Sequence, residues 1–287
     1  IKHYFIGQMK ELVEEEEALL AHKGSVPAAD VLRQAKLDGF SDKYLSQILE
    51  VPETEIRLAR TAAGITEAWE GVHVSGTQDS AYYYSSYHVK DESPVNTEKP
   101  KIMILGGGPN RIGQGIEFDY CSVHCVWALK KAGCETVIVN NNPETVSTDF
   151  DVADKLYFEP LTPEYVTNIV ELEKPDGAIV QFGGQTAIKL TETLNDLGVK
   201  ILGTDADHVD AAEDRERFDE ILEQCAIPRP KGQTVFTEEE ALAAAHMLGY
   251  PVLVRPSYVL GGQGMQIAAS DADICEFMAI INRTIQD

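Results

Sequence analysis

The residues best suited to chemistry lie near the end of the chain, where Arg255 follows an apolar run and precedes a glycine-rich loop. Residues 251–254 predict a strand that ends at this arginine, and residues 265–268 predict the strand that returns. Between them, Gly261 and Gly262 would let backbone N–H groups approach an anion, while the Arg255 guanidinium offers a fork of donors. The pattern is typical of a nucleotide phosphate site, although a glycine-rich hairpin is also common as a simple turn.

A second glycine-rich turn occupies residues 106–115, between a predicted strand over residues 101–105 and a predicted helix over residues 116–131. It departs from the dinucleotide fingerprint, because Arg111 stands where the third glycine is required. The next strand ends in asparagines rather than in an acidic residue for a ribose. Both departures argue against a nicotinamide cofactor, and a tight structural turn remains the alternative.

The middle of the chain alternates strands and helices. Further strands are predicted over residues 136–139, 155–158, 177–180 and 199–202, with helices over residues 162–173 and 186–197. This alternation predicts an α/β fold with a doubly wound, mostly parallel sheet. Ligands of such sheets bind beyond the carboxyl ends of the strands, where both this glycine turn and the Gly183-Gly184 turn fall.

An all-helical segment precedes this sheet, with helices predicted over residues 8–22, 27–37, 41–49 and 52–62. Ser41 is the predicted N-cap of the third. After the sheet, a helix over residues 207–224 contains Arg215 and Arg217, which could bind phosphate or pair with neighbouring acids. A strand over residues 233–235, a helix over residues 238–248, the Arg255 hairpin and a helix over residues 271–284 complete a partial α+β unit.

Composition bounds the function. The net charge of −23 argues against a nucleic-acid partner and against a basic membrane-binding surface. The sequence has no apolar run long enough to span a membrane, and its five cysteines show no CxxC spacing, which favours reduced thiols in a cytoplasmic protein. Cys121 and Cys125 share a predicted helix face beside His124, where core packing is favoured over a metal site.

Five motifs in order resemble the family of carbamoyl-phosphate synthetase large chains. They are Gly108–Tyr120, Asn142–Asp149, Gly183–Thr186, Ala212–Phe218 and Val254–Gly262. The helical segment is similar to the oligomerisation domain that precedes the second half of that chain. The resemblance implies the middle of a longer protein. Its parts would be a helical oligomerisation domain over residues 1–75, a linker over residues 76–99, a pre-ATP-grasp α/β domain over residues 100–206, and the first part of an ATP-grasp domain over residues 207–287.

The resemblance implies a ligase that phosphorylates carbamate with ATP, giving carbamoyl phosphate and ADP. Arg255 and Arg215 would contact the ATP phosphates, and Gly261 and Gly262 would belong to a loop that closes over them. Arg111, Gly115 and Glu117 would lie near the route by which carbamate reaches the site, and Arg111 would have a catalytic role there.

The complete enzyme of this family uses bicarbonate, two ATP and magnesium, with ammonia supplied by a glutaminase small chain, in arginine and pyrimidine biosynthesis. The magnesium-binding acids would lie beyond Asp287, so the chain alone is expected to be inactive. Self-association through the helical domain is also expected. Two departures stand out: the linker lacks the family's Asp-Thr-Cys-Ala run, and Gln263-Gly264 replaces an Arg-Ala pair.

Two alternatives remain open. A biotin carboxylase would share the pre-ATP-grasp domain and the glycine loop, but the preceding helical domain and the run over residues 109–115 favour the synthetase. A non-catalytic module would use residues 1–70 for assembly and keep an inert nucleotide fold. Biotin-dependent carboxylation distinguishes the first alternative, and an ATP titration beside sizing with and without the helical segment distinguishes the second.

Overall fold

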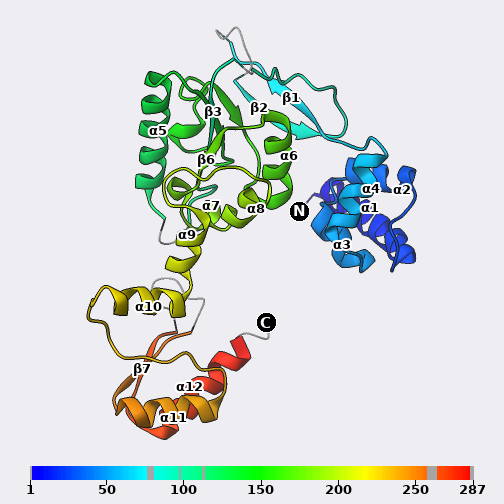
Figure 1. Ribbon diagram of the computed structural model, residues 1–287. Helices are drawn as coiled ribbons and strands as arrows, with labels where there is room; N and C mark the ends of the chain where they lie inside the picture. Colours follow the sequence, from blue (N-terminus) through cyan, green and yellow to red (C-terminus); the bar gives the residue numbers. More distant parts are fainter. Residues whose placement is uncertain (1, 76–80, 97, 112–113, 257–263, 285–287) are drawn as a thin grey trace. The chain divides into compact units, whose positions relative to one another are not determined.

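The computed structural model describes the chain except for residues 1, 76–80, 97, 112–113, 257–263 and 285–287 (Figure 1). The side chains of residues 215, 216, 283 and 284 also lie outside the description. The chain divides into two compact units. The first contains residues 1–110 and 116–209, and the second contains residues 111–115 and 210–287. Within the described part, none of the helices combines the length and apolarity that crossing a bilayer requires.

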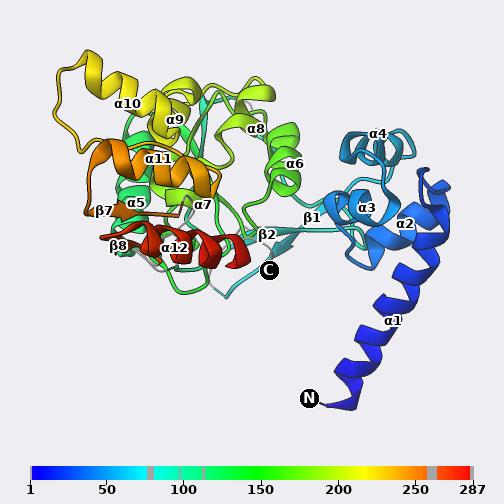
Figure 2. The same ribbon diagram turned by 90° about the horizontal axis from the view of Figure 1, so that it is seen from below.

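The first unit begins with helices that largely match the expected ones. They are α1 (His3–Leu19), the 3-10 turn η1 (Leu20–His22), α2 (Ala29–Leu37), α3 (Asp42–Leu49) and α4 (Glu53–Ala62). Ser41 caps α3 as predicted, because its side chain accepts a hydrogen bond from the Tyr44 N–H at 3.1 Å. Leu19 is the one buried residue of α1, whose N-terminal turns lie away from α2, α3 and α4 in Figure 2.

A six-stranded sheet follows, in the order β1-β2-β5-β4-β3-β6. Its parallel centre consists of β3 (Lys101–Leu105), β4 (Glu135–Val139), β5 (Lys155–Tyr157) and β6 (Gly177–Ile179). The expected strand over residues 199–202 is reduced to one bridge between Ala178 and Ile201. The mostly parallel sheet predicted from the strand–helix alternation is therefore present.

Helices cover both faces of this sheet, which explains why every residue of β3, β4 and β5 is buried. Helix α5 (Ile116–Lys131) packs Val123 and Val126 against Ile104 on one face. Helices α6 (Pro163–Glu173), α7 (Gly184–Ile188) and α8 (Thr191–Asp196) cover the other (Figure 1). The expected single helix over residues 186–197 is thus divided into α7 and α8.

The expected linker supplies a strand instead. β2 (Tyr82–Ser86) pairs antiparallel with β1 (Ala68–Val72) and joins the parallel sheet through Tyr83 and Tyr157. The physical reason is aromatic burial, because tyrosine and tryptophan favour strands and pack well on a sheet. The ring of Trp69 lies 4.7 Å from that of Tyr157, centroid to centroid. The tyrosine run therefore extends the sheet edge.

A buried carboxyl group adjoins this edge and makes stability depend on pH. Burial raises the pKa of Glu159 to about 7, although a hydrogen bond from the Ser85 N–H opposes that rise. A carboxyl with a raised pKa stabilises the fold at low pH and loses that contribution as the pH rises through the raised value. Relative to Glu159→Gln, we expect the native protein to lose roughly 1 to 3 kcal/mol of unfolding free energy between about pH 4.5 and pH 8. Urea titrations of both proteins across this range test the prediction, and parallel pH profiles would contradict it.

Ion pairs join α6 to the helical segment. The Lys36 ammonium lies 2.7 Å from the Glu164 carboxylate and 3.0 Å from that of Asp42, and all three side chains are at least nine-tenths buried. The second Glu164 oxygen accepts the Asp42 N–H at 2.8 Å. Arg60 completes the group by pairing with Asp42 at 2.7 Å. Within the first unit, these contacts therefore connect residues 36–60 with Glu164, which lies more than 100 residues later in the sequence.

The second unit contains an antiparallel hairpin and two helices beside it. Strands β7 (Val252–Val254) and β8 (Gln266–Ala268) pair, and α11 (Glu238–Leu248) and α12 (Asp271–Thr284) share a small apolar core with them. Residues 233–235 form no strand. The expected helix over residues 207–224 is interrupted at Asp214, between α9 (Ala206–Glu213) and α10 (Arg215–Gln224). The cause is a cap: the Asp214 carboxylate accepts the Arg217 N–H at 2.9 Å.

Candidate functional site

The carboxyl edge of the parallel sheet carries the first glycine turn. The Gly106 N–H donates to the Val139 carbonyl at 2.9 Å, which extends the pairing of β3 with β4. A Cβ at Gly106 would stand only 2.4 Å from Cγ of Asn140. Residue 106 must therefore be glycine for the Asn140 side chain to lie where it does.

Asn140 is the residue that organises this turn. It is buried, its Oδ1 accepts the Gly108 N–H at 3.0 Å, and its Nδ2 donates to Ser147 Oγ at 3.1 Å. The Ser147 N–H in turn donates to the Asp119 carboxylate at 3.1 Å. The asparagine that ends the second predicted strand thus shapes the glycine turn instead of facing a ribose. The position of Asn140 at the end of a predicted strand is visible in the sequence, but its role in the turn is not.

The second glycine turn packs directly against the first. It forms η3 (Gln181–Gly183) after β6, and a Cβ on Gly183 would stand 2.5 Å from the Gly106 carbonyl oxygen and 2.7 Å from that of Leu105. Because β4 and β6 lie on opposite sides of β3, the two turns flank the point where the strand order reverses. Ligands of doubly wound sheets bind at this point.

Replacing Gly183 by alanine tests this packing. The added methyl would overlap main-chain oxygens of β3 and its turn, which cannot move as a flexible side chain can. We expect Gly183→Ala to lower the unfolding free energy by roughly 1 to 3 kcal/mol in thermal or urea unfolding. Gly7→Ala is the control, because apart from its chain neighbours and its own helix backbone no atom lies within 4 Å of a Cβ there; as a helical glycine it should gain up to about 1 kcal/mol. Equal stability of the two variants would contradict the packing.

The predicted phosphate contacts belong to the second unit. Arg255 directly follows β7, is exposed, and forms no hydrogen bond or ion pair with another described residue. Arg215 is the first residue of α10, but its side chain lies outside the described residues, as do Gly261 and Gly262. Arg217, by contrast, pairs with the Asp210 carboxylate, which is the structural alternative considered for it.

The predicted carbamate-route residues are exposed. Arg111 and Gly115 belong to the second unit, and Glu117 lies in the first turn of α5 in the first unit. Within the described residues, the side chain of Arg111 has no hydrogen-bond or ion-pair partner. The shared role of these three residues stays a prediction.

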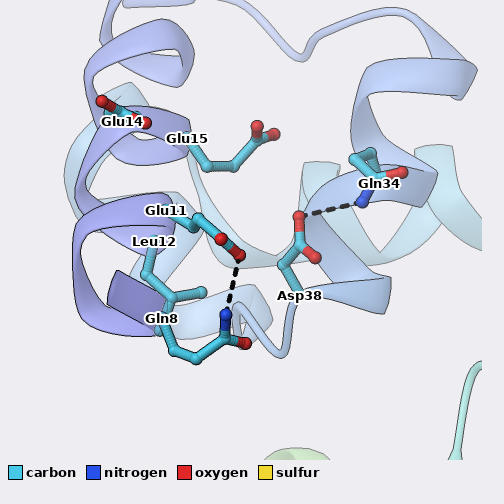
Figure 3. A pocket seen from close by; sticks show the side chains of 7 residues that line it. All are labelled: Gln8, Glu11, Leu12, Glu14, Glu15, Gln34 and Asp38. Carbon is cyan, nitrogen blue, oxygen red and sulfur yellow. Dashed lines mark hydrogen bonds between the residues drawn. The ribbon is translucent and has the colours of Figure 1, made fainter. Parts of the chain in front are cut away.

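A hollow in the helical segment is a poor phosphate site. Figure 3 shows its lining between α1 and α2, where Glu11, Glu14, Glu15 and Asp38 contribute carboxylates. Gln8 and Gln34 donate to two of these carboxylates, at 3.2 and 3.0 Å. Four acidic groups repel an anion, so the electrostatics exclude a nucleotide phosphate here.

The described thiols and acids do not form a metal site. Across the described ranges, no group of three or more His, Cys, Asp or Glu residues is placed to hold one. Cys121 is exposed and Cys125 is half-buried against the α5 core, and both are free. His124 instead lies between two aromatic rings, 4.2 Å from the Tyr120 centroid and 5.0 Å from that of Trp127.

Comparison with protein families gives three consecutive matches. Residues 1–64 match the oligomerisation domain of the carbamoyl-phosphate synthetase large chain, and residues 98–211 match the carbamoyl phosphate synthase preATP-grasp domain. Residues 214–286 match the ATP-binding domain of the carbamoyl-phosphate synthase L chain. The matches follow the order that the motifs predicted.

Individual relatives carry the same name. The carbamoyl phosphate synthase large chain of Lachnoclostridium phytofermentans is 57% identical over 99% of this chain, and that of Agathobacter rectalis is 56% identical over 99%. The chain spans 27% of the length of each. A solved structure, the biotin carboxylase domain of 2-oxoglutarate carboxylase from Hydrogenobacter thermophilus, is 21% identical with a TM-score of 0.48, covering 63% of this chain and 40% of that one.

Proposed function

We propose that this chain, which belongs to the family of carbamoyl-phosphate synthase large chains, is the central part of such a large chain. In this role it helps to phosphorylate carbamate with ATP. The observation that carries the proposal is the set of three consecutive family matches, which together reach from residue 1 to residue 286. An exposed arginine at the end of β7, with its donors available, supports it from the structure.

In the proposed reaction, a carbamate oxygen forms a bond to the γ-phosphorus of ATP while the bond from that phosphorus to the ADP oxygen breaks. Negative charge shifts onto the phosphoryl oxygens and the leaving ADP during this transfer. The planar guanidinium of Arg255 can donate two hydrogen bonds to such oxygens, and Arg215 would add a second cation from the start of α10. Magnesium, when bound with ATP, would supply further neutralisation; we assign its ligands to acids outside residues 1–287.

The glycine hairpin between β7 and β8 would close over the triphosphate through Gly261 and Gly262. At the described base of the hairpin, Gly264 has a positive φ of 73° that favours glycine. Closure would exclude water, to which carbamate and acyl phosphates are unstable. Arg111, with Gly115 and Glu117, would border the route by which carbamate arrives.

The domain organisation is part of the proposal. We assign residues 1–75 to a self-associating helical domain, residues 76–99 to a connection that contributes β2, residues 100–206 to the pre-ATP-grasp domain and residues 207–287 to the ATP-grasp domain. The complete protein would work in the cytoplasm with a glutaminase small chain that supplies ammonia, and would use bicarbonate. Its product would serve arginine or pyrimidine biosynthesis.

The reverse reaction provides a direct test that needs no small chain. The complete protein, at the length of its relatives, should form ATP from ADP and carbamoyl phosphate. Absence of ATP formation, with biotin-dependent carboxylation in its place, would overturn the proposal. The isolated 287-residue chain is expected to form no carbamoyl phosphate, because it spans only 27% of the length of the relatives it matches.

A further inference from the structure

Helix α5 carries apolar side chains on the side that faces water as well as on the side that packs against the sheet. Val123 and Val126 are buried, whereas Ile116, Tyr120 and Trp127 are 75%, 63% and 48% exposed. A helix on a protein surface normally presents charged and polar groups to water, and a helix that is apolar all round is normally buried. The composition of α5 therefore indicates that another element covers its exposed side.

The exposed side chains form one stripe along the helix. Ile116, Tyr120, His124 and Trp127 are spaced four, four and three residues apart, which places them on the same side of α5. Between ring centroids, His124 lies 4.2 Å from Tyr120 and 5.0 Å from Trp127, so the three rings form a continuous surface. We call these four residues, together with Cys121, which is exposed next to Tyr120, the outer face of α5.

The outer face lacks the charges of an ordinary solvent-exposed surface. Within α5, all of whose residues are described, no Asp, Glu, Lys or Arg is exposed between Glu117 and Lys131. Val146 and Phe150, in the loop that hydrogen-bonds to α5 through Ser147, are also about half exposed. Many aromatic and few charged side chains are typical of the centre of a protein–protein interface. The outer face of α5 is therefore suited to contact another folded domain.

The rest of the complete chain offers an occupant for this face. Residues 1–287 span 27% of the length of the relatives they match, so most of a complete large chain lies outside them. A domain of the same chain meets the outer face at a high effective concentration. A second copy has no such advantage, and a net charge of −23 on each copy would oppose their approach. A domain of the same chain is therefore favoured as the occupant.

Glu117 connects the outer face with the proposed reaction. It lies in the first turn of α5, next to Ile116, and is one of the residues assigned to the route of carbamate. Carbamate is unstable in water, so the domain that forms it has to adjoin this route closely enough to exclude solvent. A domain that docks on α5 beside Glu117 would meet that requirement.

We propose that the outer face of α5 is the docking surface for the carbamate-forming domain of the same complete chain. The inference rests on the proposed function and adds a contact surface to it. Tyr120 and Trp127 would be the central anchors, because large aromatic side chains dominate the binding energy of such interfaces. Ile116 would complete the contact at the end nearest Glu117.

A photoreactive residue on the outer face identifies the occupant. Trp127→p-benzoylphenylalanine retains a large aromatic side chain in the complete protein, and light cross-links it to whatever covers α5. We expect cross-links within one chain, to residues outside 1–287, in a yield that does not change with protein concentration. Cross-links to residues within 1–287, cross-links between two chains, or the absence of cross-links would overturn the proposal.

Trp127→Glu places a charge in the contact and tests whether the occupant supplies carbamate. Synthesis of carbamoyl phosphate from bicarbonate, ammonia and ATP should fall at least about tenfold, as the loss of a central aromatic anchor predicts, and more ATP should be consumed per carbamoyl phosphate formed. ATP formation from ADP and carbamoyl phosphate needs no transfer of carbamate between domains and should keep its native rate. Leu58→Glu, which adds the same charge at an exposed leucine of α4, should leave both rates native.

The outcomes separate the docking surface from the proposed function. Native synthesis by Trp127→Glu would overturn the docking surface and leave the function standing. Equal losses in both of its reactions would identify a structural role for Trp127 and would also overturn the docking surface. Failure of the native complete protein to form ATP would overturn the function itself. If Trp127→Glu does not fold, Tyr120→Ala, which only removes an exposed ring, should show the same selective loss of synthesis.

Discussion

Replacing Arg255 by alanine in the complete protein is expected to lower carbamoyl-phosphate synthesis at least about a hundredfold. The reason is electrostatic. The guanidinium lies at the end of β7, is exposed, and is not engaged by another described residue, so its donors are available to phosphoryl oxygens. A hundredfold loss corresponds to about 2.7 kcal/mol of transition-state stabilisation, within the range for one charge-stabilising donor. Rates of carbamoyl phosphate formation at saturating ATP measure it.

Two variants make the result interpretable. Arg255→Lys retains the charge but loses the two-pronged geometry, so its rate should lie between those of the native protein and Arg255→Ala. Arg33→Ala removes an exposed arginine from α2 in the helical segment and should leave the rate unchanged. If Arg255→Ala retained a near-native rate while unfolding normally, Arg255 would have no place in the site.

The central fold could be read from the sequence because its signals are local. Strand β3 and helix α5 have the predicted bounds, since an unbroken apolar run and a glycine turn mark them unambiguously. Strands β1 and β2, at one side of the sheet, were missed because their signal is not local. Glycine and serine near Tyr82–Ser86 suggest a loop, and only burial of the tyrosines against Tyr157 makes a strand favourable there.

In the candidate site, too, features with local sequence signals could be predicted and features that depend on distant residues could not. Both glycine turns could be placed at strand ends from their positions alone. The role of Asn140 could not, because its partners Gly108 and Ser147 come from separate loops that the strand order brings together. The interruption of the helix at Asp214 was missed for another reason: a carboxylate within a helical pattern can cap a new helix as readily as it can face solvent.

Loss of the Glu173 carboxylate is expected to have the largest effect on stability. Its side chain is fully buried at the end of α6, where Oε1 lies 2.5 Å from the Lys155 ammonium. Lys101 and Tyr157 also donate to this carboxylate, and both lysine side chains are at least nine-tenths buried. Removing one partner of such a group leaves buried charge uncompensated, at a cost of about 3 to 5 kcal/mol.

The pH dependence of this group has a definite sign. Burial alone would raise the pKa of Glu173, but hydrogen bonds from Lys101, Lys155 and Tyr157 outweigh it and lower the pKa below the usual value. A carboxylate with a lowered pKa stabilises the fold above its unfolded-state pKa, and that contribution is lost as the pH falls through the lowered value. The substitution should therefore be compared at pH 7, where the carboxylate contributes fully.

Glu173→Gln should accordingly lower the unfolding free energy by about 3 to 5 kcal/mol in urea titrations followed by Trp69 fluorescence. Trp69 is a suitable probe because its ring packs on Tyr157, and Trp127→Phe removes the other tryptophan.

Glu171→Gln is the matched control on the same helix. Glu171 pairs with Arg57 at 2.8 Å, but its side chain is 58% exposed, so this substitution should cost at most about 1 kcal/mol of unfolding free energy. Combining Glu173→Leu with Lys101→Met and Lys155→Met should recover only part of the loss, because Glu135 stays buried beside this group and loses the two nearby lysine charges. If Glu173→Gln cost no more than Glu171→Gln, the buried charges would be compensated by other groups, and the carboxylate would not be what holds α6 to β3 and β5.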